Sequence, residues 1–505
     1  MNTGGKMIYG AVVWLALGCL IFLPRTEAVT PPPDGGYPGG NTAEGQKALF
    51  SLTTGAFNTA IGWLSLETNT TGQFNTGIGA GALALNIANE NTATGTGALL
   101  FNTSGFQNTA AGALALFHNT TGHQNTATGD QALFNNTEGL RNTANGFVAL
   151  AGNITGSDNT AVGDSSLVIN TQGDQNTAVG STALFFNTSG SENTAIGYHA
   201  LFSNNTSSDN TAVGSQALFS NTTGIFNSAF GQGALGSNTT ASHNTAAGGG
   251  ALFSNNVGEN NVAVGFEALN DSVADNNTAM GTAALISNTT GHSNTGVGFQ
   301  ALYSNTVGQS NVALGVNAGL FATTGSNNVY IGAGLNGIAG ESDTCYIASI
   351  FGQTSIGGAP VLVNANNRLG TMTSSRRFKE DIKPMGTASQ SLFSLEPVIF
   401  HYKKEIDPAA KSQLGLVAED VEKVNPDLVV RDKEGKPYSV RYDQVNAMVL
   451  NEFLKEHQKV QELEAALARL ENNFAARLKE QDAKIQKVSD SIELTKAAPQ
   501  TADNR

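Results

Sequence analysis

Two side chains in the C-terminal third of the chain, Ser374 and Lys379, form a candidate nucleophile and base. A serine hydroxyl needs a base to accept its proton, and a lysine can serve when its amine is neutral. Burial, or neighbouring cations such as Arg376 and Arg377, favours the neutral form of a lysine. Residues five apart do not share a helix face, so a turn must bring the two side chains together. The alternative interpretation is a solvated basic loop without chemistry.

The pair lies at an abrupt change in composition, which indicates a boundary between two kinds of fold. Of the 26 Lys and Arg residues in this 505-residue chain, only five precede Ser374. The earlier segment consists largely of Asn, Thr, Ala, Gly and Leu, and the later one of Lys, Glu and Leu at helical spacing. The net charge of −14 argues against nucleic acid as a partner, because phosphate binding requires a basic face.

Residues 1–28 are typical of a secretory signal peptide. An apolar run extends from Met7 to Leu23, and Thr26-Glu27-Ala28 supplies a small residue for cleavage. The alternative is an uncleaved membrane anchor, for which the run is barely long enough. Residues 29–40 are rich in Pro and Gly and predict a flexible linker. We therefore expect a secreted or cell-surface protein without a membrane span beyond the signal peptide.

Residues 41–332 repeat an Asn-Thr-Ala-x-Gly unit every 17 residues, with two steps of 16. A leucine recurs eight residues after the start of the repeats, from Leu49 through Leu302, as in the unit Asn210–Phe226, which reads NTAVGSQALFSNTTGIF. Such a unit is too short for a pair of helices, because helical repeats need more than about 30 residues. It predicts one coil of a parallel β-solenoid with two short strands, Thr-Ala-Val-Gly and Ala-Leu-Phe. Turns are expected at Gly and at Asn-Thr-Thr-Gly.

Stacked coils would place leucine over leucine and asparagine over asparagine along the axis. At about 4.8 Å per coil, the 18 repeats give a rod of roughly 85 Å. One coil buries few apolar side chains, which favours three chains sharing an axis. The alternative is a monomeric left-handed helix with three short faces per turn. The repeat resembles the Asn-Ser/Thr-x-Ala-x-Gly units of YadA-like trimeric adhesin heads, which form left-handed parallel β-rolls.

We expect the repeat to be a structural spacer or adhesin-like fibre, with an unidentified cell-surface or glycan ligand. One alternative is binding to ice or another crystalline surface, because Thr59, Thr76 and Thr92 begin a row of hydroxyls. Another is a tailspike-like glycan-degrading enzyme, which requires paired carboxylates. The acidic residues of the repeat are scattered singly. Clustered metal ligands and phosphate-cradling glycine motifs do not occur in the sequence, so neither metal nor cofactor is expected.

The segments after the repeat predict three further parts. Residues 333–373 contain apolar β runs separated by glycine and are expected to form a neck, followed by a small domain at 374–443. Residues 444–493 carry apolar side chains at alternating spacings of three and four, which predicts a coiled coil before a polar tail at 494–505.

The segment from Ser374 onward resembles the endosialidase-type intramolecular chaperone, a peptidase family found at the ends of phage tail spikes and fibres. The resemblance rests on Gly415-Leu-Val-Ala-Glu-Asp-Val421, on the long helix that follows, and on Ser374, Arg377, Lys379 and Ile382. Ser375 stands where the family usually has Asp. The resemblance implies that Ser374 is the nucleophile and Lys379 its general base. Together they would cut the Thr373–Ser374 bond once a homotrimer has formed.

These features predict a mainly β protein. Its solenoid, which we expect to be trimeric, is followed by a small α+β chaperone domain and a C-terminal coiled coil. The only enzymatic activity expected is that of a self-cleaving serine peptidase, and the principal partner is the chain itself, as a homotrimer.

Overall fold

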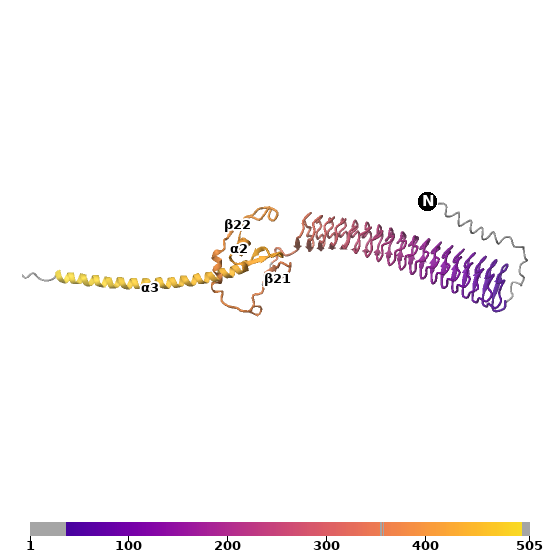
Figure 1. Cartoon of the computed structure of the whole chain (residues 1–505), viewed down its shortest axis with the longest axis horizontal. Helices are drawn as coiled ribbons and strands as arrows, with labels where there is room; N and C mark the ends of the chain where they lie inside the picture. Colours follow the sequence, from indigo (N-terminus) through magenta and orange to yellow (C-terminus); the bar gives the residue numbers. More distant parts are fainter. Residues whose placement is uncertain (1–36, 354–355, 357, 497–505) are drawn as a thin grey trace, which may run out of the picture. The chain divides into compact units, whose positions relative to one another are not determined.

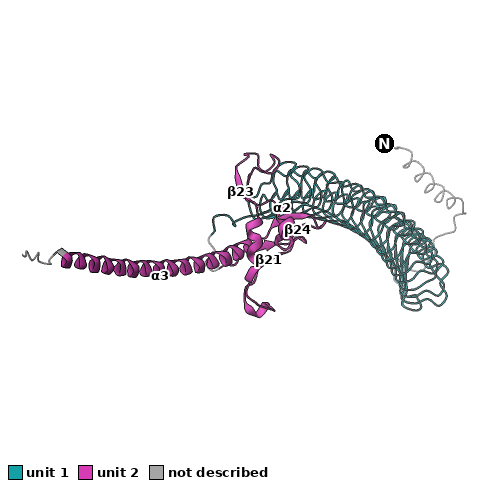
Figure 2. Cartoon of the chain, turned by 60° about the vertical axis from the view of Figure 1, so that its left-hand side comes forward, with its two compact units in different colours: residues 1–353 teal, residues 354–505 magenta. Residues whose placement is uncertain are grey.

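The computed structural model describes residues 37–353, 356 and 358–496. The predicted signal peptide, residues 29–36 of the predicted linker and residues 497–505 of the predicted tail lie outside the described residues. The chain divides into two compact units, residues 1–353 and 354–505 (Figure 2). Among the helices of the described ranges, none combines the length and apolar character needed to cross a membrane.

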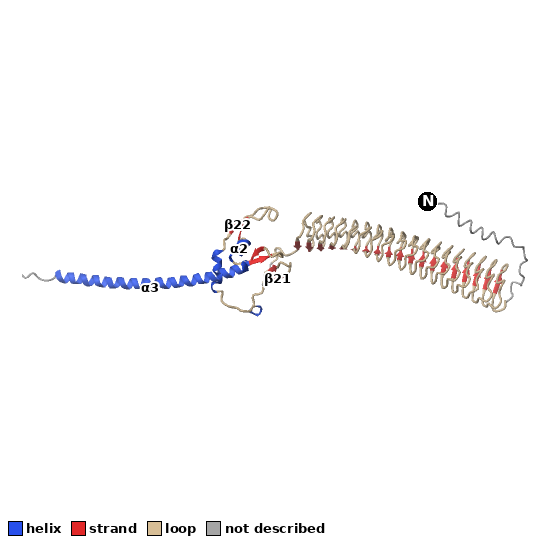
Figure 3. Cartoon of the chain, in the orientation of Figure 1, coloured by secondary structure: helices blue, strands red, loops and turns tan. Residues whose placement is uncertain are grey.

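The first unit is a parallel β-solenoid, as predicted, with one three-residue strand per coil. The strands lie along one side of the unit (Figure 3), and each pairs in register with the strand of the next coil. Thr194 thus lies beside Thr211, and Ala195 beside Ala212. Over the described residues the strands are β1 (Thr42–Glu44), β2 (Thr59–Ile61), β3 (Thr76–Ile78), β4 (Thr92–Thr94), β5 (Thr109–Ala111), β6 (Thr126–Thr128), β7 (Thr143–Asn145), β8 (Thr160–Val162), β9 (Thr177–Val179), β10 (Thr194–Ile196), β11 (Thr211–Val213), β12 (Ser228–Phe230), β13 (Thr245–Ala247), β14 (Val262–Val264), β15 (Thr278–Met280), β16 (Thr295–Val297), β17 (Val312–Leu314), β18 (Val329–Ile331) and β19 (Cys345–Ile347).

The second strand predicted in each coil is wrong, because the Ala-Leu-Phe segment forms a turn. Leu201 and Leu218 both have φ of 50°, in the left-handed region that bulky residues rarely adopt. This conformation costs roughly 1–2 kcal/mol per residue. Burying a leucine stabilises the fold by about 1.5–3 kcal/mol, so burial outweighs the strain. The turn directs the leucine into the coil and lets 17 residues complete one circuit.

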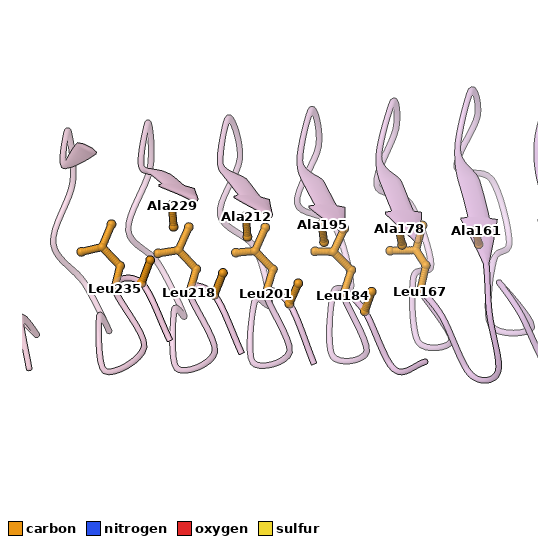
Figure 4. Packing of buried hydrophobic residues seen from close by; sticks show 14 of the residues in the cluster. Ala161, Leu167, Ala178, Leu184, Ala195, Leu201, Ala212, Leu218, Ala229 and Leu235 are labelled. Atoms are coloured by element: carbon orange, nitrogen blue, oxygen red, sulfur yellow. The ribbon is translucent and has the colours of Figure 1, made fainter. Parts of the chain in front are cut away.

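The core of most coils consists of one leucine and two alanines, all supplied by the same chain. In the coil that contains β10, Ala195, Ala200 and Leu201 are completely buried. Leucine stacks on leucine and alanine on alanine from coil to coil (Figure 4). The single chain therefore buries this core without a second copy. The thin core no longer argues for three chains, and the trimer stays a prediction.

Two rows of buried asparagines connect the coils. In the row that begins each repeat, the backbone N–H of Asn210 donates to Oδ1 of Asn193 (3.1 Å), and Nδ2 donates to the carbonyl of Gly224 (2.9 Å). In the second row, Nδ2 of Asn221 donates to Oδ1 of Asn204 (3.0 Å) and to the same Gly224 carbonyl (3.0 Å). Stacked asparagines were predicted, but the sequence interpretation treated the second row only as turn residues. The two rows supply most of the partners that buried amides require, although Oδ1 of Asn69, Asn238 and Asn305 has none.

A glycine ends each strand because the next coil lies too close for a side chain. Gly214 has φ of 137°, and a Cβ added there would lie 2.5 Å from the carbonyl oxygen of Gly231. Real Cβ atoms do not approach a carbonyl that closely, and the φ value is also one that glycine alone adopts readily. The close spacing of successive coils therefore depends on this contact between two glycine backbones.

Two tyrosines close the C-terminal end of the solenoid. Tyr330 occupies the position of a core alanine, is completely buried and stacks on Tyr346 with ring centroids 5.7 Å apart. Burial raises the pKa of Tyr330. The Tyr346 hydroxyl donates to the Glu341 carboxylate at 2.8 Å. Because β19 pairs with β18, the solenoid continues beyond residue 332, into the segment predicted as a neck.

The second unit combines three hairpins with short helices and one long helix. Its elements are β20 (Val361–Val363), β21 (Leu369–Thr371), η1 (Arg376–Phe378), η2 (Gly386–Ser394), β22 (Val398–Phe400), β23 (Gln413–Gly415), α2 (Ala418–Val424), η3 (Pro426–Leu428), β24 (Val429–Arg431), β25 (Pro437–Val440) and α3 (Tyr442–Lys496). Three antiparallel pairs form, β20 with β21, β22 with β23 and β24 with β25. A small core of Val421, Leu428, Val429, Val440 and Met448 joins α2 and the last hairpin to the start of α3.

The segment predicted as a coiled coil is one continuous helix, α3, of 55 residues (Figure 1). At 1.5 Å per residue it is about 80 Å long. Beyond its first turns, the side chains of α3 are exposed to solvent. The pairing of this helix with copies of itself stays a prediction.

Candidate self-cleavage and assembly site

A short 3₁₀ turn, η1, brings Ser374 and Lys379 together. The Lys379 ammonium donates a hydrogen bond of 3.2 Å to Oγ of Ser374. Two backbone hydrogen bonds hold the turn, from the N–H of Phe378 to the carbonyl of Ser375 (3.0 Å) and from the N–H of Lys379 to the carbonyl of Arg376 (3.1 Å). Both side chains of the pair are exposed. The distance suits proton transfer between a nucleophile and a base, whereas the exposure leaves the ammonium in water.

Ser375 occupies the N-cap position of η1, and its side chain makes no capping hydrogen bond. An Asp at such a position commonly accepts a hydrogen bond from a backbone N–H of the first turn. On the other side of the turn, the guanidinium of Arg377 lies over the Phe378 ring, 4.6 Å from its centroid. The N-cap position of η1 is therefore left without a side-chain cap.

The Gly415–Val421 segment connects the last strand of a hairpin to α2 and packs against the start of α3. The backbone N–H of Leu416 donates to the Tyr442 hydroxyl at 3.0 Å. A Cβ at Gly415 would lie 3.0 Å from the same hydroxyl, so a side chain there would press on this contact. Arg431 and Glu422 form an ion pair of 2.6 Å between β24 and α2. These contacts fix the beginning of α3 on the small domain.

A polar cluster that sequence reasoning missed lies between η2 and α3. Ser389 is completely buried, and its hydroxyl donates to the Glu452 carboxylate. Nδ2 of Asn451 donates to Ser389 at 2.6 Å, and Lys455 donates to Glu452 at 2.6 Å. The hydrogen bonds from Lys455 and then Ser389 lower the pKa of the Glu452 carboxyl. The sequence carries little signal for this polar cluster, because Ser389 is more than 60 residues away from Asn451 and Glu452.

The second unit exposes many large apolar side chains. Ile399, Leu414 and Tyr438 are 71, 81 and 76 % exposed, although all three lie on strands. The whole apolar stripe of α3 is exposed as well: Val460, Leu463, Leu467, Leu470, Phe474, Leu478, Ile485, Val488 and Ile492. Contiguous exposed apolar surface of this kind marks an interaction site.

The outward face of the solenoid carries the threonine row noted in the sequence. The row is in register and unbroken from β1 to β11, and is then interrupted by Ser228, Val262, Val312 and Val329. Within the described ranges, no three His, Cys, Asp or Glu side chains come together as metal ligands.

Comparison with known proteins gives one match, and it covers the site. Residues 374–430 match the family described as chaperone of endosialidase. No curated protein and no solved structure matches the chain. The matched segment begins at Ser374, includes Lys379 and Gly415–Val421, and ends within β24. Residues 374–430 therefore form an endosialidase-type chaperone domain, placed between a β-solenoid and a long C-terminal helix.

Proposed function

We propose that the chain is a tail-fibre-like structural protein whose second unit gathers three copies and then separates itself from the solenoid by cutting the Thr373–Ser374 bond. The exposed apolar stripe of α3 carries the proposal. A helix of 55 residues with leucines 52–76 % exposed is not expected to be stable alone in water. The alternating spacing of the stripe suits helices that bury it against copies of themselves. The number three comes from the family resemblance.

The chaperone role is supported by the need to align copies before their solenoids associate. Each strand of the solenoid pairs with a strand about 17 residues away, and registers that are one coil out of step satisfy nearly the same contacts. Copies that begin to associate out of step would therefore be trapped in unequal alignment. A helix that first aligns the copies at one end sets a common starting point. This argument supports an assembly module rather than a turnover enzyme.

The Ser374–Lys379 contact, together with the proposed assembly, supports self-cleavage. Burial of a lysine favours its neutral amine, so packing of copies around η1 would allow Lys379 to accept the hydroxyl proton of Ser374. Oγ of Ser374 then attacks the carbonyl carbon of Thr373. The C–N bond breaks, Lys379 returns the proton to the leaving Ser374 amine, and an ester joins the two parts. Water hydrolyses this ester, which leaves a carboxylate at Thr373 and a free N-terminus at Ser374.

We also propose that the protein acts outside the cell, as a secreted or surface-attached fibre. Support comes from the signal-like residues 1–28 and from the near absence of basic residues in the solenoid. A rod with few charges, most of them acidic, suits a spacer that holds its two ends apart. The cell-surface or glycan ligand of this rod is not identified.

The test compares the intact and native masses of the purified full-length chain with those of three variants, Ser374→Ala, Lys379→Met and Ser375→Ala. We expect the parent chain to yield two fragments that meet between Thr373 and Ser374, from particles of three chains. Ser374→Ala and Lys379→Met should stay uncut at the same particle mass, whereas Ser375→Ala should still be cut. Identical fragments from Ser374→Ala would rule out this nucleophile, and a single-chain native mass before cleavage would rule out assembly.

A further inference from the structure

The outward face of the solenoid carries an apolar row that neither the core nor the hydrogen-bond ladders use. Each strand buries its middle residue and turns its first and third residues outward. We define the outer row as the third residues of β8–β19: Val162, Val179, Ile196, Val213, Phe230, Ala247, Val264, Met280, Val297, Leu314, Ile331 and Ile347. Every member is apolar, and most of the large ones are between 36 and 46 % exposed.

The outer row lacks the charges that solvent-facing strands normally carry. From β2 to β19, no first or third strand residue is charged. Acidic residues of the same coils, such as Asp164, Asp209 and Glu267, lie in the turns instead. Burying an unpaired charge in a contact costs solvation energy. The placement of acidic residues in the turns and apolar residues in the outer row is therefore what a surface buried by a partner requires.

The third residues are apolar without a break only in the half of the solenoid that is adjacent in sequence to the chaperone domain. Ile61 and Ile78, the third residues of β2 and β3, are also apolar but are separated from this run. The third residues of β4–β7 are Thr94, Ala111, Thr128 and Asn145, so the row is mixed there. A crystalline surface would be matched by an unbroken row of hydroxyls, yet the threonine row is interrupted in the half where the outer row is most apolar. The distribution therefore favours a protein partner that begins at the C-terminal end of the solenoid.

We propose that the outer row is the surface along which copies of this chain pack side by side, with the rows of the copies meeting at a common axis. The inference rests on the proposed assembly through α3, which would bring the C-terminal ends of identical solenoids together. Twelve coils at about 4.8 Å give a strip of about 58 Å, and strands of three residues make it about 10 Å wide. The strip offers roughly 600 Å² per copy, against about 800 Å² per partner in a typical stable complex. The contact is therefore an addition to α3 rather than a substitute for it.

Identical copies suit this strip because the contact is set by a repeat. Parallel copies in equal alignment place Ile196 of each chain at the same height, and the same holds for the other members of the row. The repeat spacing of one copy then matches that of the next, because the copies are identical. Because equal positions of the copies meet, each member of the outer row needs only to be apolar, and its residue type can differ from coil to coil.

Disulfide trapping in the full-length chain tests the proposal. In a Cys19→Ser, Cys345→Ser background, a cysteine replaces Ile196 in the outer row, Thr206 in a turn of the same coil, or Leu467 in the stripe of α3. A disulfide requires Cα atoms about 4.4–6.8 Å apart, so Ile196→Cys should cross-link at least about ten-fold more than Thr206→Cys. Both Ile196 and Thr206 are exposed in the single chain, which makes them a matched pair.

The Leu467→Cys arm separates this inference from the proposed function. Cross-linking at Leu467 without cross-linking at Ile196 would overturn the contact along the outer row and leave assembly through α3 intact. Absence of cross-links at both positions would overturn both proposals. Equal cross-linking at Ile196 and Thr206 would indicate random encounters and would also overturn the outer-row contact. If Ile196→Cys does not cross-link and the parent chain changes the shape of growing ice crystals, the outer row is instead a surface that binds a crystal, and the contact between copies is overturned.

Discussion

The two units of this chain differ in what they leave exposed. In the solenoid, Leu201 is completely buried by its own chain, and two rows of asparagines bond each coil to the next. In the second unit, Leu467 on α3 is 57 % exposed and Leu414 on β23 is 81 % exposed. For the proposed assembly, the comparison makes the stripe of α3 the main contact between copies and the outer row of the solenoid an addition to it. On this proposal the solenoid chiefly supplies length.

The largest expected effect comes from the exposed stripe of α3. The double substitution Leu467→Asp, Leu470→Asp would place six carboxylates in a three-chain seam, and burying each leucine contributes about 1.5–3 kcal/mol. We expect complete loss of the assembled particle, measured as native mass, with the circular dichroism of the solenoid retained. Ala465→Asp, on the opposite side of the helix, should assemble normally. Assembly of the double variant would mean that the stripe is not the contact.

A smaller effect is expected from the solenoid core. Leu201→Ala leaves a cavity between coils and should destabilise the solenoid by about 2–5 kcal/mol, seen as a lower denaturation midpoint. The particle mass should not change, because the core is filled within one chain. Ser215→Ala, at a partly exposed position one coil away, should shift stability by less than about 0.5 kcal/mol. Dissociation of the Leu201→Ala particle into single chains would contradict the conclusion that the core of the solenoid is filled within one chain.

The asparagine rows should contribute somewhat less per residue. Asn187 donates to Oδ1 of Asn170 (2.8 Å) and accepts from Nδ2 of Asn204 (2.9 Å). Asn187→Ala leaves Oδ1 of Asn170 without a partner, at about 1–3 kcal/mol, whereas Nδ2 of Asn204 keeps its hydrogen bond to the carbonyl of Ser207. The same denaturation measurement checks this value, with the exposed Thr206→Ala as control. A midpoint equal to that of the parent chain would show that water replaces the lost amide.

The smallest effect concerns the cluster that fastens α3 to η2, and it depends on pH. Because the folded state lowers the pKa of Glu452, its carboxylate stabilises the fold above the ordinary glutamate range. This stabilisation is lost as the pH falls through the lowered pKa. Hydrogen exchange of residues 386–394 should therefore be faster in Glu452→Gln than in the parent at neutral pH, and the difference should shrink on acidification. The exposed Glu456→Gln should exchange like the parent at every pH.

The sequence predicted the solenoid because its signal is repeated. Spacing of Asn, Gly and Leu over 18 units identifies the coil, its parallel stacking and the inward position of leucine. It did not predict that Leu201 turns the chain, because a leucine between Ala and Phe has the local propensity of a strand. Only closure of a 17-residue circuit imposes the left-handed conformation. Local preference and circuit geometry compete at this residue, and geometry prevails because the side chain is buried.

The site was predicted unevenly for a related reason. Ser374 and Lys379 are five residues apart, so one local turn suffices to join them, and the family resemblance identifies both. Ser389 and Glu452 meet only after η2 has packed on α3, and neither residue belongs to a recognisable motif. The exposed state of Ile399 and Leu414 was likewise invisible, because an apolar strand residue is normally assigned to a core.

The glycine contact between neighbouring coils has a consequence for how such a chain can vary. Since Gly214 meets Gly231 in the same way that Gly231 meets Gly248, the gain or loss of one repeat leaves both ends of the rod chemically unaltered. Each such event changes the reach of the fibre by about 4.8 Å. The length of the solenoid can therefore change in steps of one coil, while the tyrosine-capped end and the domain that follows it keep the same sequence.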